Sequence, residues 1–382
     1  MTQSQPGAER VHLDAGAGAP LHPAAREVMT AAQERGFADP RALHGAGRDA
    51  RLLLDNAREV VAECLGLRRE EVFFTSPVDA VQRGMLGLAA ARVRVGGHVV
   101  HSAVEHAHVR HAALWWAGSH GGETREVPVD LRGAVAEADV ISHCAGAGVA
   151  VAAVQLANHE VGTVQPVGAF PLPDGVPMFV DASPALGHLD LPAEHWSAAA
   201  GHATAWGGPP GVGVMIVRRG ARWTNPFPGD PAPTDAGGGL PDVPGALAAA
   251  AALRATLAEH DEVAARQRRL VDRIREAAAA VPDTDVVGDP RDRLPHLVTF
   301  SCLYVPGEAL VRALDRHGFG VASGSACTAS TLEPSHVLAA MGALTHGNVR
   351  VSLGRQVTEA QVERFCAVLP GVVQDLRAEI GL

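Results

Sequence analysis

The first feature of this sequence that bears on chemistry is a glycine-rich loop that contains no lysine. Residues 201–220, GHATAWGGPPGVGVMIVRRG, run from a loop with little side-chain bulk into an apolar strand. Loops of this kind often hold a phosphate or a cofactor, because glycine lets the backbone approach the ligand closely. Neither this loop nor the rest of the chain contains lysine, since all 32 basic residues are arginines. A cofactor bound here has no lysine amine to which it could attach.

Cysteine thiols are the candidate nucleophiles. The five cysteines are odd in number, far apart and without a CxxC pair, which favours a reduced compartment over a disulfide framework. Cys327 lies in GSACTAS, among small and hydroxyl-bearing residues, and is either a sulfur-handling thiol or an ordinary surface thiol. Reactivity there requires a lowered thiol pKa. Apolar neighbours favour core or surface thiols at the other four positions: Cys64, Cys144, Cys302 and Cys366.

A histidine cluster offers a second candidate chemistry. The segment HSAVEHAHVRH places His101, His106, His108 and His111 close together, and such clusters can bind zinc or copper. Histidines are scattered through the whole sequence, however, and two of these four fall where a strand and a loop are expected. We therefore expect no metal site.

Composition and charge exclude several partner classes. The chain has 382 residues and a formal net charge of −10, which argues against nucleic acid because a phosphate-binding surface needs a basic excess. Its apolar runs are too short for a bilayer, and MTQSQPGAER lacks the apolar core of a signal peptide. We expect a globular protein of two domains in the cytoplasm, with no membrane partner.

Strand and helix patterns alternate through the first two-thirds of the chain. Short strands are expected in EEVFFTS, GGHVVHSAVEH, ADVISHCAG, VAVAAVQLAN, VPMFVDAS and GVGVMIV. Strands that alternate with helices predict a mostly parallel, three-layer sheet, whose ligands gather beyond the carboxyl ends of the strands. A surface loop follows at 226–244, and then one long helix over about 245–281. The predicted domains are 12–250 (large) and 1–11 with 251–382 (small, α+β).

Eight segments, in this order, resemble the cysteine desulfurases, within the class V aminotransferase group of fold type I pyridoxal phosphate (PLP) enzymes. They are VHLDAGAGAPLHPAAREVM, LHGAGRDAR, AVEHAHV, ANHEVGTVQPV, FVDASPALGHLDL, GGPPGVGVMIVRRG, GSACTASTLEPSHVLAAMG and NVRVSLGR. The resemblance covers essentially the whole chain. It implies an α/β fold, with a mostly parallel seven-stranded sheet in a three-layer large domain and a small α+β domain.

By the same resemblance, this chain differs from the family at the positions that hold the cofactor. The family's Schiff-base lysine corresponds to Ala205, and the serine and histidine that help hold the phosphate correspond to His202 and Thr204. The family's phosphate loop here contains Pro77, which removes an amide donor, and Asp79, which brings negative charge towards a dianion.

Further departures affect the contacts to the cofactor ring and the subunit boundary. Pro184 replaces a glutamine, His159 replaces the asparagine near the cofactor's phenolic oxygen, and the loop around DAGGGLPDVPG is shorter than the stretch that reaches the neighbouring subunit. Together these losses predict that PLP binding is lost and that the chain has no cofactor.

Four functional positions of the family are retained. Cys327 matches the cysteine that takes sulfur as a persulfide, and Arg350 matches the arginine that holds the substrate carboxylate. His106 matches the residue that stacks on the cofactor ring, and Asp181 the acid that pairs with its pyridine nitrogen. We expect Arg350, His106 and His159 to contact substrate. The alternatives are a structural ion pair for Arg350 and relic core positions for His106 and Asp181.

Two functional hypotheses follow. The first is a PLP-independent protein of sulfur trafficking or sulfur incorporation, with Cys327 as the persulfide-carrying or nucleophilic thiol. The second is a catalytically silent pseudoenzyme that acts as scaffold or regulatory partner of an active desulfurase or a sulfur acceptor. The family's dimers imply a homodimer, or a heterodimer with a desulfurase-like subunit, and a sulfur-acceptor protein as a further partner. A working enzyme with non-covalent PLP is the least favoured reading.

Overall fold

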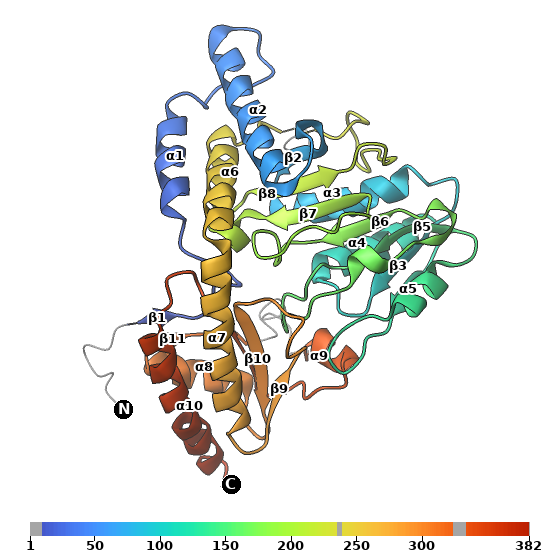
Figure 1. Cartoon of the computed structure of the whole chain (residues 1–382). Coiled ribbons are helices and arrows are strands. Elements are labelled where there is room, and N and C mark those ends of the chain that lie inside the picture. Colours follow the sequence, from blue (N-terminus) through green and yellow to red (C-terminus); the bar gives the residue numbers. More distant parts are fainter. Residues whose placement is uncertain (1–9, 235–238, 324–333, 382) are drawn as a thin grey trace.

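The structure is a computed structural model that describes residues 10–234, 239–323 and 334–381. The large domain is built on a seven-stranded sheet with strand order β2-β8-β7-β6-β5-β3-β4 (Figure 1). Strand β8 pairs antiparallel with β2 and β7, and all other pairs are parallel. The strands are β2 (Val72–Thr75), β3 (His98–Ser102), β4 (Thr124–Val127), β5 (Val149–Ala153), β6 (Met178–Asp181), β7 (Ala198–His202) and β8 (Gly213–Val217).

Helices cover both faces of this sheet, which gives the three layers expected from the sequence. Alternate strand residues point to opposite faces, so that Val99 joins the cluster under α3 and α4 while Val100 joins the cluster under α2 and α6. Helix α2 ends where Gly66 adopts a left-handed conformation (φ 65°), as the sequence predicts. The helices are α1 (Pro23–Gln33), α2 (Gly45–Leu65), α3 (Pro77–Ala90), α4 (Ala107–Ser119), α5 (Glu137–Cys144) and α6 (Val243–Ala258).

The small domain has its own core around Phe300, Leu310 and Phe365. Its antiparallel sheet has the order β12-β10-β9, and the short N-terminal strand β1 pairs with β11. The small-domain elements are β1 (Val11–His12), α7 (His260–Ala279), β9 (Thr284–Val287), β10 (Leu297–Cys302), α8 (Gly307–Arg316), β11 (Phe319–Gly320), α9 (His336–Ala340), β12 (Asn348–Ser352) and α10 (Glu359–Ala378).

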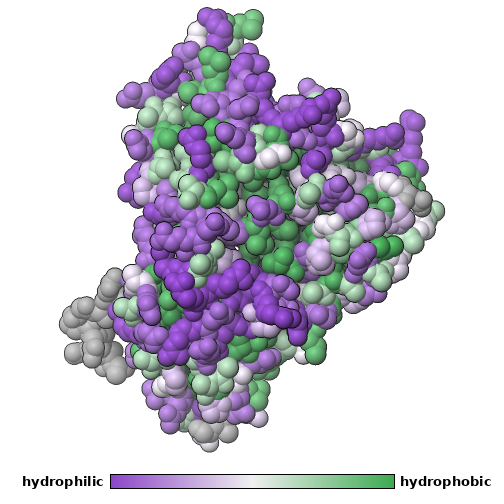
Figure 2. Space-filling view, viewed as in Figure 1, coloured by the Kyte–Doolittle hydropathy of each residue, from purple (hydrophilic) through white to green (hydrophobic). Residues whose placement is uncertain are grey.

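The single helix expected over 245–281 is two consecutive helices, α6 and α7, separated at Glu259. Helix α6 packs its alanine-rich length into the large-domain core, whereas Leu270, Val271 and Ile274 of α7 belong to the small-domain core. In Figure 2 the surface over α7 is mainly hydrophilic, and hydrophobic residues gather beside it, near the centre of the view. The two helices therefore link the two domains.

Three strand expectations for the large sheet need correction. The segment ADVISHCAG forms helix α5, because Val140 and Cys144, four residues apart, both face the core, and two acidic residues occupy its first turn. The sequence analysis also missed the edge strand β4 and the strand β7, whose alanine-rich residues lack the β-branched character of a typical strand. Among the described residues, no helix combines the length and apolar character needed to cross a membrane.

Candidate functional site

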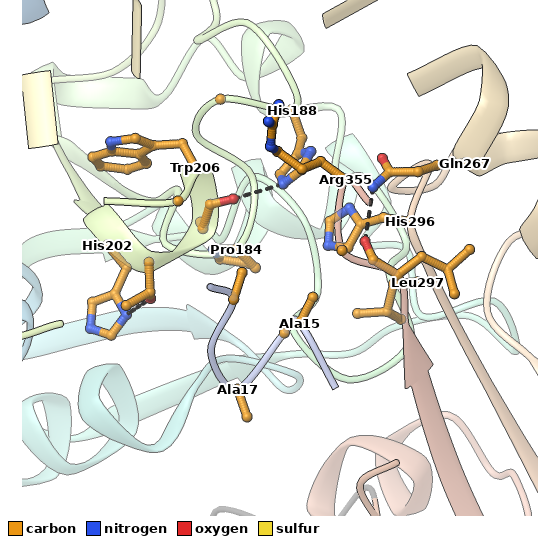
Figure 3. A pocket seen from close by; sticks show the side chains of 18 of the residues that line it. Ala15, Ala17, Pro184, His188, His202, Trp206, Gln267, His296, Leu297 and Arg355 are labelled. Atoms are coloured by element: carbon orange, nitrogen blue, oxygen red, sulfur yellow. Dashed lines mark hydrogen bonds between the residues drawn. The ribbon is translucent and has the colours of Figure 1, made fainter. Parts of the chain in front are cut away.

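A cavity of about 700 Å³ lies beyond the carboxyl ends of β6 and β7, between the two domains. This volume is within the range of small-molecule sites, and the position is where parallel sheets place their ligands. Figure 3 shows His202 on one side of the cavity and His188, Gln267, His296 and Arg355 on another.

The cavity brings together most of the site residues expected from the sequence. Asp79 is not part of its lining, although its helix neighbour Pro77 is. Cys327 lies outside the described residues. The expected residues in the lining are His106, His159, Asp181, Pro184, His202, Thr204, Ala205 and Arg350.

Ala205, where the resemblance leads us to expect the family's lysine, lies in a turn that is anchored by hydrogen bonds. It belongs to the 3-10 turn η4 (Ala203–Trp206), which follows directly on β7. The buried indole of Trp206 donates a hydrogen bond to the carbonyl oxygen of Ala249, and the carbonyl oxygen of Trp206 accepts one from Thr256. Both contacts come from α6, so the position of Ala205 is fixed by the large-domain core.

Neutral imidazoles form one wall of the cavity. His106 caps the N-terminus of α4, where its Nδ1 atom accepts a hydrogen bond from the amide of His108. Its ring lies edge-on to the rings of His108 (centroids 4.3 Å apart) and His159 (4.8 Å). Burial, together with the neighbouring histidines, lowers the pKa of His106 to about 3 and holds that of His159 well below 6.5.

Asp181 stands at the end of β6 and is almost fully buried. Its Oδ1 atom accepts a hydrogen bond from the amide of Ser183 (2.9 Å). Burial raises the pKa of Asp181, and its charge in turn favours protonation of His108 and His202. His202 Nδ1 also lies 3.1 Å from the Thr204 hydroxyl. The Asp181 carboxylate thus acts electrostatically on His108 and His202.

Arg350 projects from β12 with its guanidinium already engaged by the protein. Nη2 donates to Oδ1 of Asp14 (3.0 Å), and Nη1 donates to the carbonyl oxygen of His159 (3.1 Å). The side chain is 6% exposed. The ion pair with Asp14 joins the N-terminal segment to the small domain and accounts for much of this arginine's hydrogen bonding. A carboxylate ligand therefore has to compete with Asp14 for the Arg350 guanidinium.

The N-terminus of α3 already has a hydrogen-bond acceptor, the Ser76 hydroxyl, and a negative charge, the Asp79 carboxylate. Ser76 caps the helix by accepting a hydrogen bond from the amide of Asp79 (3.2 Å). The Asp79 carboxylate accepts a hydrogen bond from the Thr75 hydroxyl (3.3 Å) and lies in the first helical turn, where it complements the helix dipole. Pro77 supplies no amide proton. A phosphate approaching this helix end meets a carboxylate and few free donors.

The sequence analysis missed a second group of polar side chains, on the small-domain side of the cavity. The rings of His188 and His296 stack with centroids 4.1 Å apart. Gln267 of α7 donates to the carbonyl oxygen of Leu353 (2.8 Å), and Arg355 pairs with Glu259 at the junction of α6 and α7. These residues come from segments far apart in the chain, so no local spacing points to the group.

The four cysteines that the structure describes are free thiols. Burial raises the pKa of each, to about 12 for Cys144 and about 11 for Cys366, and upward also for Cys64 and Cys302. At neutral pH these four are therefore protonated and poor nucleophiles.

Comparisons with known proteins settle the family. Residues 11–365 match the aminotransferase class-V family. The chain belongs to this family. It is 36% identical to the "IscS-like cysteine desulfurase" of Mycobacterium tuberculosis, over 96% of this chain and 97% of that protein. It is 30% identical to the "Cysteine desulfurase IscS" of Methanosarcina thermophila, over 96% and 93%.

Solved structures agree with this assignment. A "NifS-like protein" superposes with a TM-score of 0.86 at 25% identity, over 96% of this chain and 100% of that one. The apo structure of a cysteine desulfurase from Thermococcus onnurineus NA1 gives a TM-score of 0.82 at 21% identity, over 96% and 95%, and shows the shared fold. The fold expected from the sequence is confirmed. The chemistry of the family is therefore the standard with which the residues of this site are compared.

Proposed function

We propose that this class-V aminotransferase homologue acts in sulfur trafficking or sulfur incorporation without PLP, with Cys327 as the thiol that carries persulfide sulfur. The observation that carries the proposal is a chain without lysine, in which Ala205 lines the cavity at the position where the resemblance leads us to expect the family's lysine. A cytoplasmic, reducing location suits a protein with free thiols.

The residues at this site do not fit PLP. An imine to the protein needs an amine that the chain lacks, and the α3 N-terminus offers a carboxylate where a phosphate dianion needs donors. The imidazoles of His106 and His159 contact one another in the cavity. We therefore derive no chemical step that passes through this cofactor.

The sulfur chemistry rests on the thiols. Because burial raises the pKa of the four described thiols, Cys327 is the remaining candidate nucleophile. In the proposed step the Cys327 thiolate attacks the outer sulfur of a small persulfide, RSSH. The donor's S–S bond breaks, a new S–S bond forms on Cys327, and the donor leaves as a thiolate. No external oxidant or reductant is needed.

Intact mass spectrometry tests this function. Protein prepared without PLP is treated with a low-molecular-weight persulfide and freed of reagent. We expect the wild type and a Cys64→Ser control to gain the mass of one sulfur atom, and Cys327→Ser to gain none. Equal loading of the wild type and Cys327→Ser, or no loading of either, contradicts the proposal.

A silent partner subunit is the second candidate function. Leu114 and Trp115 of α4 are 58% and 48% exposed, and the Phe227 ring lies 6.3 Å from Trp115. Such an exposed apolar group is typical of a surface that binds another protein. This candidate predicts a complex with an active desulfurase on co-expression, altered activity of that desulfurase, and no change on Cys327→Ser. A Leu114→Glu/Trp115→Glu variant is expected to weaken the complex.

A further inference from the structure

We propose that Glu160 is a positioning residue for sulfur transfer: its buried carboxylate holds the Ser335 hydroxyl and so fixes the start of α9, the helix that follows Cys327 in the chain. The inference rests on the proposed function, because it takes Cys327 as the thiol that receives sulfur. It adds to that function a large-domain residue that is remote from Cys327 in the sequence.

The contact between Glu160 and Ser335 joins the two domains. Glu160 lies in the turn that follows β5, whereas Ser335 caps the N-terminus of α9. The Ser335 hydroxyl donates a hydrogen bond to Oε2 of Glu160 (2.8 Å) and accepts one from the amide of Leu338 (3.1 Å). Glu160 is 2% exposed and Ser335 4%. A single buried hydroxyl therefore connects the carboxylate to the first turn of α9.

The rest of α9 packs on the large domain in the same region. An apolar cluster joins this helix to the turns after β3 and β5 and to the end of β9. Its members are Val104, Val161, Val287, Val337, Leu338 and Met341. His336 adds a polar contact, since its Nε2 atom lies 2.9 Å from the carbonyl oxygen of Glu105. The turns after β3 and β5 therefore hold α9 from the large-domain side.

Glu160 is itself held in place by its backbone. Its amide donates to Oδ1 of Asn158 (2.8 Å), and its carbonyl oxygen accepts a hydrogen bond from the hydroxyl of Thr299 in β10 (2.6 Å). The second carboxylate oxygen, Oε1, is buried without a hydrogen-bond partner among the described residues. Because a buried carboxylate without partners is costly, loss of the Ser335 hydroxyl would leave this group poorly satisfied.

The titratable groups around this contact supply little other charge. Arg350 of β12 acts on Glu160 and favours its ionised form. His159, beside Glu160, and His336, beside Ser335, both have lowered pKa values and are uncharged at neutral pH. Burial raises the pKa of Glu105 well above its usual value, so this carboxyl group is also uncharged. Glu160 and Arg350 are therefore the groups that can bring charge to the contact.

Ionisation of Glu160 strengthens its bond to Ser335. Burial raises the pKa of Glu160 to about 7, so the carboxylate predominates above neutral pH and the protonated acid below it. A hydrogen bond to an ionised carboxylate is stronger than one to a neutral carboxyl group. We therefore expect α9 to be held more firmly at about pH 8 than at about pH 6.

Hydrogen exchange of the full chain, followed by mass spectrometry, tests the contact. Protection of α9 is measured at about pH 6 and about pH 8 and corrected for the intrinsic exchange rate. In the wild type we expect protection to be about fivefold higher at the higher pH. Glu160→Gln keeps an acceptor but cannot ionise, so its protection should be equal at both. Ser335→Ala should lose protection at both, whereas Ser335→Thr, which keeps a hydroxyl, should retain it.

Rates of sulfur loading on Cys327 connect the contact to function. Loading is measured at limiting persulfide by intact mass, and the wild-type rate is divided by the Glu160→Gln rate at each pH, because the two proteins share the same thiol and reagent. We expect this ratio to rise by about threefold or more from about pH 6 to about pH 8. The ratio for the exposed Glu137→Gln control should stay constant, and Ser335→Ala should load more slowly than the exposed Ser119→Ala.

A role of Glu160 in packing alone would lower the loading rate equally at all pH values. A ratio that does not change with pH, or a Ser335→Ala protein with the α9 protection and the loading rate of the wild type, therefore overturns the proposal. If the wild type loads no sulfur on Cys327, the proposed function and the positioning role fail together. If the wild type loads sulfur and the Glu160 and Ser335 variants load it equally fast, only the positioning role fails.

Discussion

The Nε2 atom of His188 donates a 2.9 Å hydrogen bond to the carbonyl oxygen of Ala205. The same imidazole stacks on His296, which lies just before β10 of the small domain, and the backbone carbonyl of His188 accepts a hydrogen bond from His260 at the start of α7. Ala205 is thus connected to the small domain through three histidines. Burial lowers the pKa of His188 to about 4, so at neutral pH this ring is uncharged.

Replacing His188 should destabilise the fold. His188→Ala removes the hydrogen bond to Ala205 and the stacking on His296, and we expect a loss of about 2 kcal/mol in the free energy of unfolding. Urea unfolding followed by circular dichroism measures the loss. The exposed His317→Ala control should change stability by less than about 0.5 kcal/mol. A His188→Ala variant as stable as this control would show that the contact contributes nothing.

Stability should fall as the solution becomes mildly acidic. Burial lowers the pKa of nine described histidines, so below about pH 6.5 the unfolded chain binds protons that the folded chain does not. The free energy of unfolding therefore decreases as pH falls from about 6.5 towards the His106 pKa of about 3. The nine are His22, His101, His106, His108, His159, His188, His202, His296 and His336.

Three carboxyl groups act in the opposite direction. Glu105, Glu160 and Asp181 have raised pKa values, so the folded chain holds protons that the unfolded chain releases, and acid favours folding through them. The histidines are the larger group, and their effect should dominate between about pH 6.5 and about pH 5. Urea midpoints at these two pH values check the sign. A midpoint that stays constant or rises on acidification contradicts the account.

An unpaired buried guanidinium should be replaceable with a gain in stability. Arg83 of α3 is 2% exposed, and its three guanidinium nitrogens have no hydrogen-bond partner among the described residues. It lies 6.0 Å from the ring centroid of Trp223, with burial lowering its pKa.

Arg83→Met keeps the packing on Trp223 and removes the charge, so we expect the free energy of unfolding to rise by about 1 kcal/mol or more. The exposed Arg316→Met variant serves as control, and thermal unfolding is the measurement. A less stable Arg83→Met protein would contradict the expectation that this buried charge costs stability.

Introducing a lysine at position 205 should not create a PLP site. An Ala205→Lys variant gains an amine, but Asp79 and the capped α3 N-terminus remain, so a phosphate gains nothing there. We expect this variant to bind pyridoxal and PLP with affinities equal to within about threefold, equivalent to less than about 0.7 kcal/mol. Absorption titrations with the two aldehydes measure the ratio. Binding of PLP far tighter than pyridoxal would show that a phosphate site persists.

Much of the fold was predictable because it depends on local pattern. The helix that ends at Gly66 and the buried strands before Pro77 and around Val214 have clear periodicity or caps in the sequence. The segment around Val140 was predicted as a strand, because a short apolar run does not distinguish the two structures. The β7 strand was missed because its alanines carry little strand preference, and tertiary pairing with β6 and β8 decides its conformation.

The site was predictable only where the family resemblance supplied positions. His106, Asp181 and Arg350 reach one cavity as expected, yet the pairing of Arg350 with Asp14 depends on the N-terminal segment lying beside β12. The stack of His188 on His296 has no sequence signal, since it is made by two loops from different domains. The role of Cys327 stays a prediction from its motif.

The most direct test of the central claim, that this protein works without PLP, is an absorption titration of the wild type with PLP, followed by desalting and quantification of retained cofactor. An active cysteine desulfurase treated in parallel provides the positive control. The account predicts no protein-bound visible band and no retained PLP on the wild-type chain. A visible band that saturates at one PLP per chain and survives desalting would contradict it.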